Sequence, residues 1–282
     1  MQIGVNTWVW VAPPTTSDLE WLIPQIAAMG FNLVELPFEV PNSFNYARAR
    51  ELADTHGLAI STVVAIGPDR DLISPDPAVR ADAVAYVRHC IEAAHQLGSR
   101  ILAGPLYSAV GRTWQMSAAE RERTMDELAQ ILRPLAEYAY QHGVTLCVEP
   151  LNRFETSLIN LTSQGCDLID RVNHPGCKLL LDTFHMNIEE RSLGAAIRMA
   201  GSRIGHVHTC ENDRGAPGSG HVPWQEVADA LKEVGYNGPL VIESFSSEVQ
   251  TIARAAAVWR SFASSQDALA REGLAFLRRL FA

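Results

Sequence analysis

The 282-residue sequence predicts a single (β/α)8 barrel. Short apolar runs and amphipathic segments alternate eight times along the chain, and alternating strands and helices indicate a parallel sheet. Eight repeats within about 250 residues favour a closed barrel over an open sheet. An open dinucleotide-binding sheet usually has a glycine-rich first turn, which residues 5–8 lack. We expect one domain, 1–282, with an extra C-terminal helix, because no linker or low-complexity segment interrupts the chain.

The expected strands are short apolar runs that end in polar residues, the pattern of buried parallel strands. In chain order they cover residues 3–7, 33–36, 59–65, 101–103, 144–148, 178–181, 204–209 and 240–242.

The expected helices begin at capping residues and commonly end at a glycine. Ser17 is the expected N-cap of the first helix, and Ser117 with Glu120 forms a capping box at the start of the fourth. The helices are expected at residues 18–29, 46–56, 77–97, 117–141, 163–172, 193–199 and 223–234, followed by two terminal helices at 249–262 and 266–281.

Composition excludes several functional classes. The net charge of −9 and the lack of a lysine/arginine block argue against a nucleic-acid partner. No run approaches the ~20 apolar residues of a membrane helix, and the chain opens on an expected strand rather than a secretory signal, so we expect a cytoplasmic protein with no membrane partner. The five cysteines have no C-x-x-C spacing, which argues against disulfides and a structural zinc site.

Four of the expected strands end in side chains that can bind a metal ion. These side chains are Glu149, Asp182, His208 and Glu243. The carboxyl ends of barrel strands converge on one face, so we expect the four to surround one divalent cation. One imidazole and three carboxylates favour Mn2+, with Mg2+ or Co2+ as alternatives. His206 is expected to be a buried barrel histidine on the same strand face as His208.

Such a centre is suited to proton transfer at a carbon beside a carbonyl. A cation that chelates a hydroxyketone stabilises the developing enediolate. Glu149 and Glu243 come from the fifth and eighth strands, almost opposite in a ring of eight. One carboxylate can therefore remove a proton from one face while the other returns it to the opposite face, without an organic cofactor. A single base that moves a proton between neighbouring carbons would instead interconvert an aldose and a ketose.

Other chemistries fit the residues less well. A Schiff-base aldolase needs a lysine at a strand mouth, and the only lysines are Lys178, at a strand start, and Lys232, on an expected helix. A multi-zinc nuclease would need more histidine ligands and a basic groove. A sugar-binding barrel without catalysis remains an alternative from another class.

The chain, most densely from Val144 to Phe245, resembles the ketose 3-epimerases (D-tagatose/D-allulose 3-epimerase-like) of the xylose isomerase-like barrels. The matching segments are 149–155 (EPLNRFE), 181–190 (LDTFHMNIEE), 205–208 (GHVH) and 224–245 (WQEVADALKEVGYNGPLVIESF).

The resemblance implies epimerisation at carbon 3 of a free ketose of the D-tagatose, D-fructose, D-allulose or L-ribulose type. It implies the metal ligands named above and assigns the acid/base roles to Glu149 and Glu243. It also implies that Glu155, His185 and Arg214 bind the substrate. We expect a homodimer or homotetramer, because the long third and fourth helices and the C-terminal pair offer surfaces for assembly.

The N-terminal half departs from that family, with Asn6 where several members carry an aromatic residue and Ala65 where they carry a cysteine. These positions lie near the far end of the sugar, so the preferred ketose stays open. Four aromatic residues either form an apolar wall there or serve ordinary packing: Trp8, Trp10, Tyr107 and Trp114.

Overall fold

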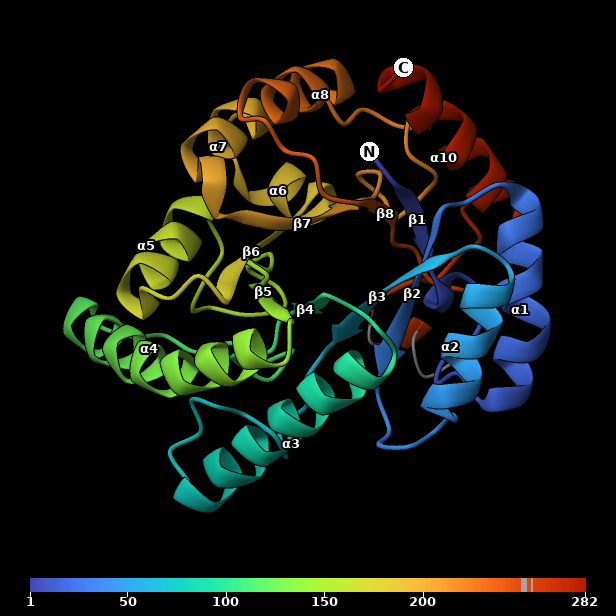
Figure 1. The fold of residues 1–282 in the computed structure, drawn as a ribbon. Helices are drawn as coiled ribbons and strands as arrows, with labels where there is room; N and C mark the ends of the chain where they lie inside the picture. Colours follow the sequence, from blue (N-terminus) through green and yellow to red (C-terminus); the bar gives the residue numbers. More distant parts are fainter. Residues whose placement is uncertain (250–252, 255) are drawn as a thin grey trace.

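The computed structural model describes residues 1–249, 253–254 and 256–282 as a closed barrel of eight parallel strands (Figure 1). The strands pair in chain order, and β1 closes the ring against β8. The strands are β1 Ile3–Asn6, β2 Leu33–Phe38, β3 Ala59–Val64, β4 Ile101–Gly104, β5 Thr145–Val148, β6 Cys177–Asp182, β7 Ile204–Thr209 and β8 Leu240–Ile242. The predicted fold class is confirmed.

The helices surround the strands, and α10 fills the place in the ring between α8 and α1 (Figure 1). None of the helices within the described ranges is long and apolar enough to cross a membrane. The helices are α1 Thr16–Met29, α2 Tyr46–Thr55, α3 Pro77–Gln96, α4 Ala118–Gln141, α5 Thr162–Val172, α6 Thr183–Glu189, α7 Leu193–Ala200, α8 Trp224–Glu233 and α10 Gln266–Leu280.

Two helix predictions need correction. Thr15, not Ser17, is the N-cap of α1, because Asp18 three residues later completes a capping box with it. The helix expected at 249–262 falls partly on residues outside the described ranges, and residues 256–262 form turns and irregular chain instead of a helix.

Helix α6 has no counterpart among the expected elements, although it positions part of the site. It begins directly after β6, where Asp182 acts as the N-cap and its Oδ1 accepts a hydrogen bond of 2.7 Å from the Phe184 N–H. The strand-to-helix transition places His185 within one turn of Asp182.

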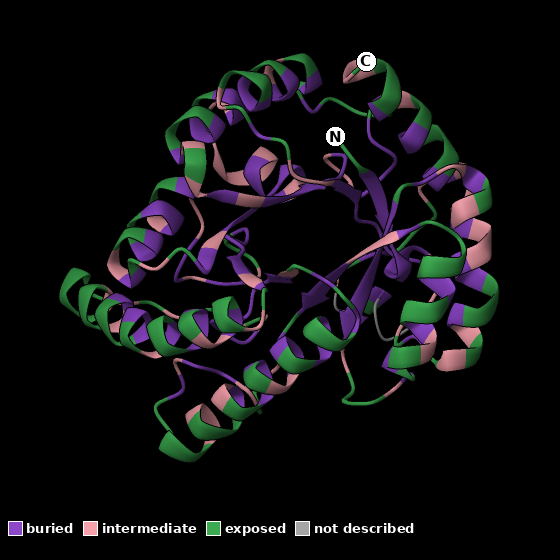
Figure 2. Ribbon diagram, viewed as in Figure 1, coloured by how far each residue is buried: buried purple, intermediate pink, exposed green. Residues whose placement is uncertain are grey.

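The barrel core has an outer and an inner part. The strands are buried almost throughout, whereas the outward faces of the helices are exposed (Figure 2). Inside the barrel, Ala103, Cys147 and Leu180 form a small apolar cluster. Cys147 and Leu180 lie two residues before Glu149 and Asp182, so strand alternation points all four side chains into the lumen. The apolar cluster closes the barrel below the polar residues.

Candidate active site

The four predicted metal ligands lie together at the carboxyl ends of β5–β8, and all are buried. Asp182, His208 and Glu243 each offer a ligand atom within 4.8 Å of the others, and Glu149, Asp182 and His185 form a second such group. Asp182 belongs to both groups and joins them. The sequence therefore identified residues that the fold brings to one place.

The hydrogen bonding of these residues fits a divalent cation. Glu149 Oε1 and His208 Nδ1 are buried and have no hydrogen-bond partner among the described residues. Nδ1 of His208 lies 3.2 Å from Oε1 of Glu243. An unpaired polar atom in the interior costs about 1–3 kcal/mol, and a cation bound between these groups supplies the missing interaction. The donor set, one imidazole nitrogen and three carboxylates, suits Mn2+, Mg2+ or Co2+.

His185 faces the pocket from α6. Its Nδ1 accepts a hydrogen bond of 3.0 Å from the backbone N–H of Asn152, and its Nε2 lies 3.1 Å from Nη2 of Arg214. Burial and the nearby Arg214 lower the pKa of His185 well below its ordinary 6.5. The ring is therefore held towards the neutral form, with Nε2 3.6 Å from Glu149 Oε1. The Asn152 amide also donates to Glu155 Oε1 at 2.8 Å, which links two of the predicted substrate-binding residues.

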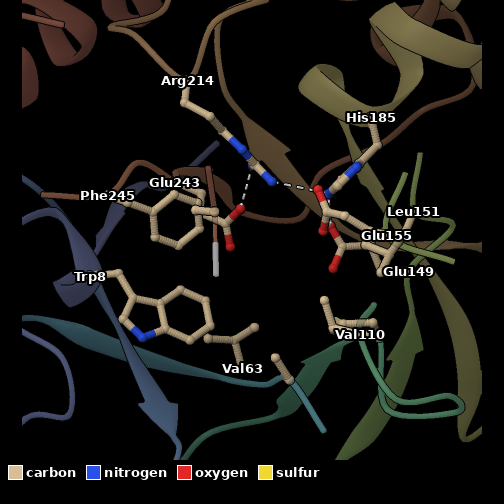
Figure 3. Close-up of a pocket in the computed structure, with 13 residues that line it drawn as sticks. Trp8, Val63, Val110, Glu149, Leu151, Glu155, His185, Arg214, Glu243 and Phe245 are labelled. Carbon is tan, nitrogen blue, oxygen red and sulfur yellow. Dashed lines mark hydrogen bonds and ion pairs between the residues drawn. The ribbon is translucent and has the colours of Figure 1, made fainter. Parts of the chain in front are cut away.

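Arg214 lies between the carboxylates rather than at the rim. Its Nη1 donates to Glu243 Oε2 at 2.7 Å (Figure 3). The same nitrogen donates to Asp182 Oδ2 at 2.8 Å, and the guanidinium packs 3.9 Å from the centre of the Phe184 ring. The backbone φ of +70° is uncommon for a residue other than glycine. Ser244 Oγ donates to the Arg214 carbonyl at 2.6 Å and holds this conformation.

The two predicted acid/base glutamates have opposite pKa shifts. Burial, followed by repulsion from Glu243, raises the pKa of Glu149 well above its ordinary 4.5. Burial also acts to raise the pKa of Glu243, but the charges of His208 and Arg214 outweigh it and lower the value to about 2. Without a bound cation, these surroundings favour the protonated form of Glu149 and the ionised form of Glu243.

The opposite side of the pocket is apolar. Figure 3 shows Trp8, Val63, Val110 and Phe245 facing the polar residues across the pocket. The Trp8 ring packs 5.6 Å from that of Phe245, and its Nε1–H donates to Glu39 at 2.7 Å. These contacts fix the orientation of the indole against the substrate space.

Only Trp8 among the four aromatic candidates belongs to this wall. Trp10 donates its indole N–H to Asp267, and Tyr107 is buried with its hydroxyl on a backbone carbonyl. Trp114 stacks under the guanidinium of Arg112, 4.5 Å from the ring centre. The alternative of ordinary packing holds for these three residues. Ala65 lies in the pocket lining, whereas Asn6 lies outside it and donates to Glu35.

The sequence analysis missed Glu35, a fully buried carboxylate in the middle of β2. It accepts hydrogen bonds from His206 Nε2 at 2.8 Å and from His208 Nε2 at 2.7 Å. Burial raises the pKa of Glu35, but the two histidines outweigh this and hold it well below 4.5. A charged residue inside the apolar run Leu33-Val-Glu-Leu36 was the signal available in the sequence.

Comparison with known proteins agrees with the fold. The family model described as the xylose isomerase-like TIM barrel matches residues 23–280. The chain is 36% identical over 257 residues to the D-psicose 3-epimerase of Ruminiclostridium cellulolyticum, covering 89% of this chain and 86% of that protein. It is 36% identical over 279 residues to the L-ribulose 3-epimerase of Mesorhizobium japonicum, covering 98% and 93%.

A solved structure gives the same result in three dimensions. The D-allulose 3-epimerase from Methylomonas sp. in complex with D-allulose has a TM-score of 0.93 and 30% identity, covering 99% of this chain and 96% of that one. The barrel, the polar cluster at its carboxyl-terminal mouth and these likenesses lead to one conclusion: this chain belongs to the ketose 3-epimerase family of enzymes within the xylose isomerase-like TIM barrels.

Proposed function

We propose that this enzyme inverts carbon 3 of a free ketose with the help of one divalent cation. The candidate substrates are D-tagatose, D-fructose, D-allulose and L-ribulose. The observation that carries the proposal is the pair Glu149 and Glu243, which come from β5 and β8 on opposite sides of the barrel, line one pocket and have opposite pKa shifts.

The proposed ligands of the cation are Glu149, Asp182, His208 and Glu243, and Mn2+ is the proposed ion because three of the four ligands are carboxylates. When bound, the cation polarises the ketose carbonyl and a neighbouring hydroxyl and makes the hydrogen on the intervening carbon more acidic. No organic cofactor enters the proposal. The unpaired Glu149 Oε1 and His208 Nδ1 support it.

The chain's own groups move the proton. The ionised carboxylate takes the hydrogen from carbon 3 on one face, and the sugar becomes a cis-enediolate. The protonated carboxyl on the other side then donates its proton to the opposite face of the same carbon. No net proton is gained or lost, and the two glutamates exchange protonation states. The proposal requires one glutamate to start as an acid and the other as a base, and the opposite directions of their pKa shifts in the metal-free protein support this difference.

Substrate binding is assigned to Glu155, His185 and Arg214. His185 lines the pocket, and its lowered pKa makes it a weak base beside the two glutamates. Arg214 is the only lysine or arginine among the described pocket-lining residues, and two carboxylates already balance its charge. This balance favours an uncharged sugar over a sugar phosphate. The apolar wall around Trp8 limits the access of water to the reacting carbon.

Incubation of D-fructose or D-tagatose with the enzyme and Mn2+ in D2O tests the proposal. We expect a new ketose with deuterium at carbon 3, detected by NMR, and loss of turnover after chelation that added Mn2+ reverses. An aldose product would show instead that the enzyme is an aldose–ketose isomerase. Sugar binding without any exchange would identify a non-catalytic barrel.

A further inference from the structure

A second polar cluster lies deeper in the barrel than the proposed reaction site. It consists of Glu35 from β2 and of His206 and His208 from β7, all 0% exposed. Its ligand-type atoms lie within 4.8 Å of one another. Glu35 does not line the pocket, whereas His208 belongs to both clusters. Glu35 is therefore a buried carboxylate that contacts the proposed metal ligand His208 on the side away from the pocket.

The hydrogen bonds of Glu35 are complete. Oε1 accepts from Asn6 Nδ2 at 3.1 Å and from His208 Nε2 at 2.7 Å. Oε2 accepts from Ser61 Oγ at 2.9 Å and from His206 Nε2 at 2.8 Å. Four donors from three strands therefore hold one carboxylate in a single orientation.

This arrangement determines the state of His208. An ionised carboxylate only accepts hydrogen bonds, so Nε2 of His208 must carry the proton that the 2.7 Å contact requires. In the neutral imidazole that metal binding requires, the lone pair then lies on Nδ1, which is 3.2 Å from Oε1 of Glu243 and has no hydrogen-bond partner among the described residues. The hydrogen bond to Glu35 thus fixes the His208 ring, and Nδ1 points towards the proposed cation.

We propose that Glu35 is a positioning residue that fixes the tautomer and ring orientation of His208 for metal binding. The inference rests on the proposed metal-dependent function and deepens it. A carboxylate behind a metal-binding histidine also raises the basicity of the ring, and loss of such a partner typically weakens metal affinity about 10- to 100-fold. Because Glu35 lies outside the pocket and contacts His208, replacing Glu35 should weaken cation binding directly and affect sugar binding only through the cation.

A second ion bound by Glu35, His206 and His208 is the competing explanation. The hydrogen bonds from Asn6 and Ser61 argue against it, because they use lone pairs that an ion would need. The two explanations differ in stoichiometry. Positioning predicts one tightly bound Mn2+ per chain, whereas a second ion site predicts two, one of which is lost in His206→Gln.

The test measures Mn2+ binding by calorimetry in the absence of sugar. We expect Glu35→Gln to bind Mn2+ about 10- to 100-fold more weakly than the wild type, because a neutral amide cannot accept from both histidines. His206→Gln is the matched control, since it changes the other histidine on the same carboxylate, and it should keep the wild-type affinity within a few-fold. Thermal unfolding of the metal-free variants verifies that each is folded.

A double-mutant cycle with His208→Gln shows whether Glu35 acts through His208. We expect Glu35→Gln to cause little further loss of Mn2+ affinity once His208 is replaced. An equal loss in both backgrounds, unchanged affinity in Glu35→Gln or a second Mn2+ per chain would overturn the inference. If Glu35→Gln does not fold, Glu35→Asp is measured in its place. Aspartate keeps the charge but is one methylene shorter, and we expect the same loss of Mn2+ affinity. A wild type that binds no divalent cation would instead refute the proposed function.

Discussion

The two halves of the barrel contribute different chemistry to one pocket. Strands β5–β8 and the residues just after them supply the buried carboxylates, His208 and the segments that carry His185 and Arg214. Strands β1–β4 and their loops supply mainly apolar lining, including Trp8, Val63 and Val110. The one buried carboxylate on β1–β4, Glu35, points away from the pocket to the β7 histidines.

In the proposed function, this difference separates the reaction from the selection of the sugar. The polar half can change the protonation of a substrate carbon, whereas the apolar half can only favour one shape or polarity of the remaining sugar. Substitutions in the polar half should therefore lower kcat or metal affinity. Substitutions in the apolar half should change the ratio of the KM values for different sugars. The predictions below test that division, from the largest expected effect to the smallest.

Glu149→Gln and Glu243→Gln should each lower kcat by at least about 10²- to 10⁴-fold, the range of general acid–base catalysis. Each change removes a proposed proton-transfer group and a proposed metal ligand. NMR of ketose interconversion at saturating Mn2+ measures the effect. Glu189→Gln, which changes a carboxylate paired with Arg153 outside the pocket lining, is the control and should stay near wild type. Normal turnover in either pocket variant would remove that residue from the acid/base role.

Arg214→Lys should lower kcat/KM about 10- to 100-fold. Lysine keeps the charge but loses the planar fork that reaches Asp182 and Glu243 together. Loss of a hydrogen bond to a charged group costs about 1.5–3 kcal/mol, which corresponds to that range. Steady-state kinetics with one ketose measures the effect, and Arg112→Lys, in an ion pair with Asp71 outside the pocket lining, is the comparison. Equal kinetics for the two variants would argue against a role of the Arg214 fork.

In metal-free enzyme at neutral pH, Glu149→Gln should unfold at a higher temperature than the wild type. Burial and Glu243 raise the pKa of Glu149 well above 4.5, so its stabilising contribution is full below pH 4.5 and is lost as the pH rises through the folded-state pKa. Glutamine stays neutral and avoids this loss. The expected rise in Tm is about 2–4 °C for each kcal/mol gained.

Calorimetric scans of chelated protein at about pH 4 and at neutral pH measure the difference. The Tm gap between variant and wild type should be present at neutral pH and small at acid pH. A gap that is the same at both pH values would mean that the charge of Glu149 is not its cause.

Val63→Thr should leave kcat almost unchanged and alter KM by less than about tenfold. The change keeps the side-chain shape but places a hydroxyl in the apolar wall, so ketoses that offer a hydrogen-bond partner there should gain. KM for two ketoses that differ at the far carbons measures the shift. Val40→Thr, at an exposed position, is the control. A loss of kcat as large as that from a glutamate change would contradict the division between the halves.

Local sequence patterns were sufficient for the fold and for the reaction half of the site. Each strand of β5–β8 is a short apolar run ending near an ionisable residue, and in a parallel barrel such ends must meet at one face. For this reason Glu149, Asp182, His208 and Glu243 could be identified before their geometry was known. Proton transfer between two opposed glutamates is still a proposal that rests on them.

Only the tertiary structure decided which partners hold these residues. Glu35 meets His206 and His208 across 171 and 173 residues of sequence, and no local pattern records such a contact. The same holds for the Asn152 N–H that donates to His185 Nδ1 and for Trp8, which alone among four similar aromatic residues faces the pocket. The sequence determined which strand ends carry charge because that depends on neighbouring residues, whereas orientation and tautomer depend on contacts that exist only after the barrel closes.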